Sequence, residues 1–150
     1  MSLSLLPLRL DDAWVAIDAL LAKEVLGRRA FVAIPGASAG LPGVIAWNGR
    51  AIAVVDLGAL AGSGRPLQAA NLRERIVVVQ VGEATFALPV DAVREVWVAS
   101  DSELRPLHAA HQRFATQEVT LNGVPLPVLD VAEMVQSLGQ GAQAAKGSLL

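Results

Sequence analysis

The sequence predicts an all-β protein with short helices, arranged as two small barrels packed side by side. About a dozen short apolar segments are separated by turn residues at regular intervals, which is typical of sandwiches and barrels. In addition, the hairpin-plus-helix pattern of Gly43 to Leu60 returns 74 residues later, with Asn48-Gly49 matching Asn122-Gly123 and Asp56 matching Asp130. A repeat of this length indicates two copies of a small β unit. Closing each unit into a barrel would remove exposed strand edges.

The first segments predict two strands and a tight turn. Leu3 to Leu10 is apolar and predicts a strand. Because Pro7 has no backbone N–H, we expect it at a sheet edge or at another position where no hydrogen bond between strands requires that N–H. Asp11-Asp12 supplies the turn, and Trp14 to Ile17 the second strand. The next residues, DALLAK, predict either a single helical turn capped by Asp18 or a strand that continues to Val25. Beyond them, residues 28–34 are expected to be extended and residues 35–43 to form a loop.

The repeated unit has the strongest local signals in the chain. Val44 to Trp47 and Ala51 to Val55 flank Asn48-Gly49, the dipeptide that most readily adopts positive φ at both centres of a type I′ turn. Asp56 follows the second strand, where its side chain can cap the first backbone N–H groups of a short helix. The sequence therefore predicts strand, turn, strand and capped helix.

The second half repeats this organisation after a linker rich in glycine at residues 61–71. Arg75 to Val81 is apolar on both faces, which favours a covered sheet. Further strands are expected over residues 85–90, 91–99, 114–121 and 124–129, with irregular chain at 101–111. Residues 130–138 predict a helix because Val131, Met134, Val135 and Leu138 share one face.

Composition excludes several classes of function. The net charge is −2, and no basic stripe with interleaved aromatic residues indicates nucleic-acid binding. The chain has no cysteine, which removes disulfides and thiolate chemistry and fits the cytoplasm. Apolar runs are too short for a spanning helix, and the first residues lack the features of a signal peptide. However, 53% of residues are hydrophobic and the mean hydropathy is +0.48, so part of the apolar excess is available for partner surfaces.

Candidate chemical sites have simpler structural explanations. His108 and His111 have the i, i+3 spacing of a metal pair, but no third ligand is evident and Pro106 interrupts a helix. Asp56 and Asp130 occupy matching places in the repeat, which favours capping over acid–base chemistry. Ser63, between two glycines, lacks the context of a phosphate loop. We therefore expect no catalytic residue, no cofactor and no metal.

Four passages in order resemble the CheW-like domain family of bacterial chemosensory adaptors. Trp14 to Val25 is similar to the family's aromatic strand and the element after it, with Ile17, Asp18, Glu24 and Val25 matching. The other passages are similar to the family's first hairpin, its second-lobe core and its closing strand and helix: Leu41 to Leu57, Arg75 to Val98 with Leu104-Arg105-Pro106, and Gly123 to Met134.

The resemblance implies two five-stranded, SH3-like β-barrel subdomains around a shared hydrophobic core. It implies a single domain over residues 1–138 made of two intertwined lobes, and from composition we expect the linker near 61–71 and a disordered tail at 139–150. It also implies a non-enzymatic cytoplasmic adaptor at receptor arrays. Such an adaptor would couple the cytoplasmic tip of methyl-accepting chemoreceptors to the regulatory domain of a CheA-type histidine kinase, without nucleic acid and without inserting into the membrane.

Partner-contact residues follow from position in the resemblance: Ala22, Glu24, Asn48, Arg50, Ala92 and Arg94. Asn48 stands where the family usually has the arginine of an Arg-Gly turn, and Ala53 replaces a usual strand proline. The alternative function is therefore a divergent module that binds only the kinase or another partner, in a type IV pilus or cyclic-dinucleotide pathway. For Glu24 the sequence leaves open partner contact or a solvated face. Trp14, Trp47 and Trp97 are expected to be buried in the cores, and for Trp97 the sequence also leaves open a place at an interface.

Overall fold

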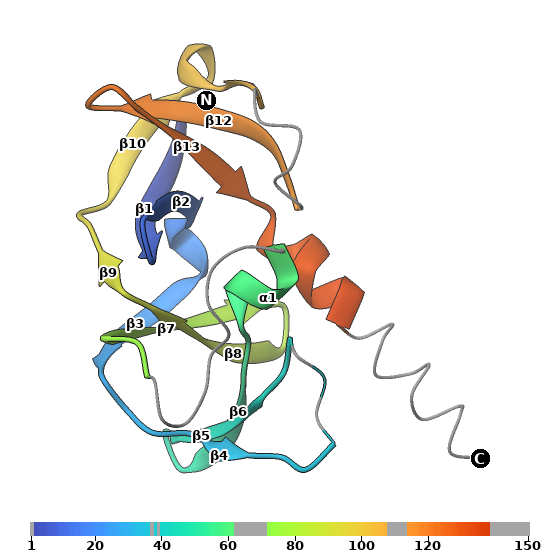
Figure 1. Ribbon diagram of the computed structural model, residues 1–150. Coiled ribbons are helices and arrows are strands. Elements are labelled where there is room, and N and C mark those ends of the chain that lie inside the picture. The colour runs from blue at the N-terminus through green and yellow to red at the C-terminus, as the bar shows by residue number, and fades with distance from the viewer. Residues whose placement is uncertain (1, 37, 39, 62–71, 108–113, 139–150) are drawn as a thin grey trace.

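The computed structural model describes residues 2–36, 38, 40–61, 72–107 and 114–138, which form two β-sheets and short helical elements (Figure 1). One sheet has seven strands in the order β10-β1-β2-β13-β12-β11, with β9 paired to β1, and the other has six in the order β3-β7-β8-β6-β5-β4. The seven-stranded sheet comprises β1 (Ser2–Leu10), β2 (Ala13–Asp18), β9 (Ala92–Val93), β10 (Trp97–Ser100), β11 (Arg105–Pro106), β12 (Ala115–Leu121) and β13 (Val124–Leu129). The six-stranded sheet comprises β3 (Ala22–Gly27), β4 (Val32–Ala33), β5 (Gly43–Trp47), β6 (Arg50–Val54), β7 (Arg75–Val81) and β8 (Ala84–Val90).

The predicted fold class is confirmed. The strands β4, β9 and β11 have two residues each, and without them each sheet has five longer strands. The helical elements are short: η1 (Ala19–Leu21), α1 (Leu57–Ala61), η2 (Asp101–Glu103) and a helix over residues 131–138. The molecule therefore consists of two strand-rich barrels, one above the other in Figure 1, with both α-helices near their junction.

The two sheets have the same topology. Each sheet contains a first hairpin, β1-β2 or β7-β8, and one copy of the repeated hairpin, β12-β13 or β5-β6. The second strands of the two hairpins pair in parallel, β2 with β13 in one sheet and β8 with β6 in the other. The repeated unit is therefore a hairpin followed by four strands and a helix, and the second copy has the two-residue strand β9 in addition. The first hairpin of each unit belongs to the sheet of the other unit. The hairpin β1-β2 lies between β10 and β13, and the hairpin β7-β8 lies between β3 and β6. The barrels are intertwined by this exchange.

The repeated hairpins have matching turns and caps. Asn48 and Asn122 have φ of 47° and 51°, and the glycines after them have φ of 77° and 80°, as a type I′ turn requires. Asp56 Oδ1 accepts a hydrogen bond from the Ala59 N–H at 3.3 Å, and Asp130 Oδ1 accepts one from the Glu133 N–H at 3.0 Å. Both aspartates are caps, as predicted.

Other segments refine the sequence-based expectations. Pro7 is not at an edge: β1 is central, but Pro7 lies between its pairings with β10 and β9, where an N–H is not needed. Both readings of DALLAK are partly right, because η1, capped by Asp18, leads into β3. Residues 94–96 interrupt the strand expected over 91–99. The linker at 62–71, the His108 and His111 pair and the tail at 139–150 lie outside the described residues.

The largest core cluster joins the two sheets. Leu6, Leu8 and Ile17 of one sheet pack with Val77 and Leu88 of the other. The capped helices cover this shared core with Leu57, Val131 and Met134, all at most 4% exposed. Each barrel also has its own smaller cluster, around Ile45 and Ile52 in one and around Leu5 and Leu126 in the other.

Candidate functional site

The structure places the six candidate residues in two groups. Ala22 and Glu24 on β3, with Asn48 and Arg50 at the β5–β6 turn, belong to the six-stranded barrel. Ala92 on β9 and Arg94 just after it belong to the seven-stranded barrel. The candidates therefore do not form one continuous site, and each barrel has a face of its own.

Glu24, Asn48 and Arg50 of the first group lie around a tryptophan, whereas Ala22 packs against the shared core. Trp47 Nε1 donates a hydrogen bond of 2.6 Å to Glu24 Oε2, and the Arg50 guanidinium lies 5.6 Å from the centre of the Trp47 ring. Arg50 also donates through Nη2 to Thr85 Oγ1 at 2.9 Å. Asn48 is exposed at the turn beside this ring. We call the surface made by Glu24, Trp47, Asn48, Arg50 and Thr85 the Trp47 face.

The Trp47 face also closes its barrel. The strand β3 is one edge of the six-stranded sheet, and β5 lies near the other edge. The Glu24–Trp47 bond joins the two, and Arg29 Nη1 strengthens the closure by donating to the Ala46 carbonyl at 3.0 Å. Glu24 is therefore exposed, with its carboxylate bonded to the Trp47 indole.

The second group adjoins the other barrel's open end. Ala92 pairs with Arg9 of β1, and the Arg94 N–H donates to the Pro7 carbonyl at 3.0 Å. The Arg94 guanidinium lies over the Trp14 ring, 5.1 Å from its centre. Each of the two candidate arginines is therefore stacked on a tryptophan, where cation and ring attract each other.

The sequence did not identify these tryptophan–arginine pairs. We expected Trp14 and Trp47 to be core residues, but both, like Trp97, are half-buried against a core cluster. A signal was present for one pair: a two-residue turn places Trp47 directly opposite Arg50 across the hairpin. The Trp14–Arg94 pair depends on long-range pairing and had no local signal.

A buried ion cluster also had no sequence signal. The Arg73 side chain is 1% exposed and pairs with Asp91, and with Asp11 at 3.2 Å. Asp91 Oδ2 also accepts the Asp11 N–H at 2.6 Å. Asp11 lies in the β1–β2 turn, Asp91 between β8 and β9, and Arg73 just before β7, so this cluster ties the two sheets together.

A hollow of about 410 Å³ lies where the chain crosses between the sheets. Apolar side chains such as Leu3, Leu21 and Phe114 line it, and Asp18, Asp130 and Glu133 make it acidic. None of the six candidate residues lines it.

Two findings concern other kinds of site. Within the described part of the chain, no three His, Asp or Glu residues are grouped so that they could hold a metal ion. No helix in the same residues has the length and apolar character needed to cross a bilayer.

Comparison with known proteins gives consistent matches. The CheW-like domain family matches residues 4–139. The chemotaxis protein CheW of Rhizobium meliloti (strain 1021) is 30% identical over 104 residues, which are 68% of this chain and 64% of that protein, so the chain spans just under two thirds of this relative. The crystal structure of the scaffolding protein TtCheW from Thermoanaerobacter tengcongensis is similar with a TM-score of 0.74 and 21% identity, covering 87% of this chain and 90% of that one.

Proposed function

The chain belongs to the CheW-like domain family, and we propose that it is a non-enzymatic adaptor that couples chemoreceptors to a CheA-type histidine kinase in a cytoplasmic signalling array. Its action would be binding: the kinase's regulatory domain would contact the barrel faces, and a receptor tip would contact the hollow between the lobes. The matched relatives, a chemotaxis protein and a scaffolding protein by name, support this class of function.

The Trp47 face is the observation that best supports partner binding. It offers a half-buried aromatic ring with an arginine over it, and tryptophan and arginine are the residues most enriched in the energetic centres of interfaces. The Glu24 and Thr85 bonds hold both side chains in place before a partner arrives. A preorganised surface loses less conformational entropy on binding. A stable complex would bury on the order of 1,200 Å² or more around this centre.

The test is binding of the purified protein to a kinase regulatory domain and to a receptor cytoplasmic fragment, measured by calorimetry. Arg50→Glu should weaken kinase binding by about tenfold or more, because it reverses the charge at the centre of the face. Arg75→Glu is the matched control: Arg75 is an exposed arginine at the far end of β7, and Arg75→Glu should bind as the parent does. Absence of binding to every such kinase domain and receptor fragment would contradict the proposal.

One observation favours the alternative function. Asn48 is exposed at the tip of the Trp47 face, and its φ of 47° suits asparagine, so the residue fits the turn as it stands. A neutral side chain at the tip favours a module that binds the kinase without the receptor. Asn48→Arg would then add receptor-dependent kinase activation. If the parent already gives full activation, this alternative is wrong.

A further inference from the structure

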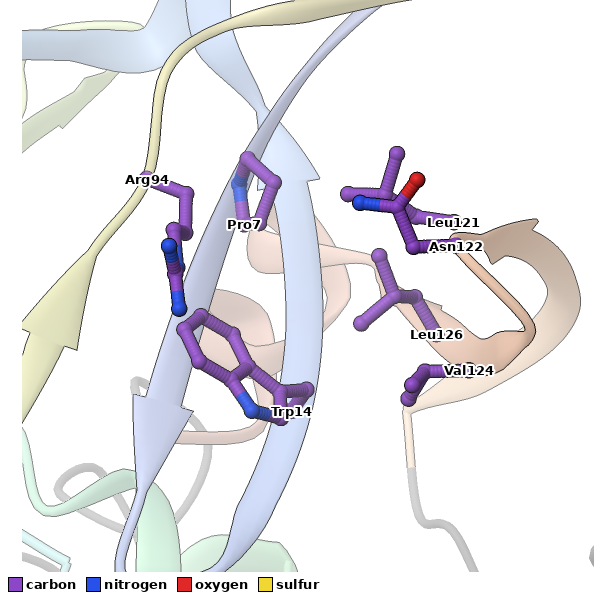
Figure 2. Close-up of a pocket in the computed structure, with 7 residues that line it drawn as sticks. All are labelled: Pro7, Trp14, Arg94, Leu121, Asn122, Val124 and Leu126. Atoms are coloured by element: carbon purple, nitrogen blue, oxygen red, sulfur yellow. The ribbon is translucent and has the colours of Figure 1, made fainter.

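The open end of the seven-stranded barrel holds a pocket of about 230 Å³ (Figure 2). Pro7, Trp14 and Leu126 form its inner wall, and Leu121 and Val124 contribute from the β12–β13 hairpin. The polar side chains lie on opposite sides: Arg94 over the Trp14 ring, and Asn122 across from it at the turn. An apolar pocket with a few converging polar groups is the usual form of a binding site.

The equivalent end of the other barrel is occupied by its own side chains. By the repeat, Leu121 corresponds to Trp47 and Val124 to Arg50. In the six-stranded barrel Trp47 packs on the core and bonds to Glu24, and Arg50 bonds to Thr85. In the seven-stranded barrel Leu121 and Val124 are smaller than these counterparts, and both line the pocket. Among the described residues, neither the Arg94 guanidinium nor the Asn122 amide makes a hydrogen bond.

The charge of the pocket determines what it can accept. Among the described residues that line it, Arg94 is the charged one and none carries a carboxylate. Arg9 lies directly opposite Trp14 across β1 and β2, and its Nε is buried with no partner in the described part of the chain. Trp14 therefore has one arginine near it from β1 and another from the segment after β9. This basic pocket contrasts with the acidic hollow at the sheet junction, so the two cavities select ligands of opposite charge.

We propose that this pocket binds an apolar side chain of a partner protein that carries a carboxylate beside it, in a segment of the type Leu-Glu-Leu. The apolar side chain would lie on Trp14 and Leu126, the carboxylate would accept from Arg94, and the Asn122 amide would bond to the segment's backbone. The volume equals only seven or eight waters at ~30 Å³ each, which fits one side chain rather than a free drug-sized ligand. The inference rests on the proposed adaptor function, in which the ligands are partner proteins.

The test uses the full chain and two capped tripeptides, acetyl-Leu-Glu-Leu-amide and acetyl-Leu-Gln-Leu-amide. Three tryptophans give three indole N–H signals in a ¹H–¹⁵N spectrum, so binding can be located. We expect the Glu peptide to shift the Trp14 signal to saturation and to leave the Trp47 signal unchanged. The Gln peptide should bind at least about tenfold more weakly, because it cannot form the charge-assisted hydrogen bond with Arg94. Arg94→Gln should abolish this preference. Arg50→Gln, the other arginine stacked on a tryptophan, should retain it.

Several results would overturn the inference: equal shifts with both peptides, a shift that follows Trp47, an unchanged preference in Arg94→Gln, or no shift up to the solubility of the peptides. Asn122→Gly keeps the positive-φ turn and should weaken both peptides equally. Calorimetry with the kinase domain and receptor fragment separates the two proposals. If these proteins bind the parent while the peptides do not, only the pocket's ligand is wrong, and if they do not bind either, the adaptor function fails as well.

Discussion

At the scale of single residues, the bond between Glu24 and Trp47 is the most direct link between stability and the proposed binding face. Trp47→Phe keeps an aromatic ring on the core but removes the N–H that donates to Glu24. In a double-mutant cycle with Glu24→Ala, which removes the acceptor, we expect a coupling free energy of about 0.5–1.5 kcal/mol, measured by urea unfolding. Trp97→Phe should show no coupling to Glu24→Ala, because Trp97 packs in the other barrel. A coupling of zero for Trp47 would mean that this bond does not stabilise the closed barrel.

Residue types predicted local roles better than they predicted surroundings. The capping roles of Asp18, Asp56 and Asp130 follow from side chains that act within three residues, and all three were found. The half-burial of Trp14 was missed because Arg94, 80 positions away in sequence, reaches its ring only through the pairing of three strands. Arg73 was missed for the same reason: composition cannot show which aspartates will surround a buried arginine.

At the scale of elements, the two repeated hairpins depend on glycine at the second turn position. Gly49→Ala and Gly123→Ala would each place a side chain at φ of about 80°, which costs ~1–2 kcal/mol of unfolding free energy relative to glycine. Each variant should lower the urea midpoint, and the double variant should show the sum because the turns are in different barrels. Gly27→Ala is the control: a Cβ there meets nothing within 4 Å, so its cost should be smaller. Equal effects at all three positions would contradict the turn assignment.

Strand and turn positions were predictable at this scale, but strand partners were not. Asn-Gly turns, a Val-rich run and capped helices specify where elements begin and end, and β7 was placed at its observed bounds. The parallel pairs of β13 with β2 and of β6 with β8 join segments separated by more than 30 residues. Sequence alternation indicates which face of a strand is apolar but does not identify its neighbour. The repeat was therefore visible, whereas the exchange of hairpins between the repeats was not.

At the scale of the whole molecule, the Arg73 cluster holds the two barrels in a fixed relation. Removing one partner of a fully buried ion pair costs about 3–5 kcal/mol. Arg73→Met should therefore lower the unfolding free energy by up to about this amount, because Asp91 and Asp11 would lose the buried guanidinium that they share. Glu74→Gln, at the exposed neighbouring residue, is the control and should change stability little. A small loss in Arg73→Met would show that the shared core alone fixes the barrels.

The exchange of hairpins makes a stronger prediction about the chain as a unit. Each barrel takes strands from both repeats, so neither residues 1–66 nor residues 67–150 contain a complete sheet. Cutting the protein at a protease site engineered within residues 62–71 should leave the fragments associated, because the shared core and both sheets still join them. After separation in denaturant, each fragment alone should lack the β-sheet signal in circular dichroism, and mixing should restore it. The uncut protein with the same inserted site is the control for the insertion. Fragments that fold alone would show that each repeat can close its own barrel, contrary to the observed pairing of β1-β2 with β10 and β13.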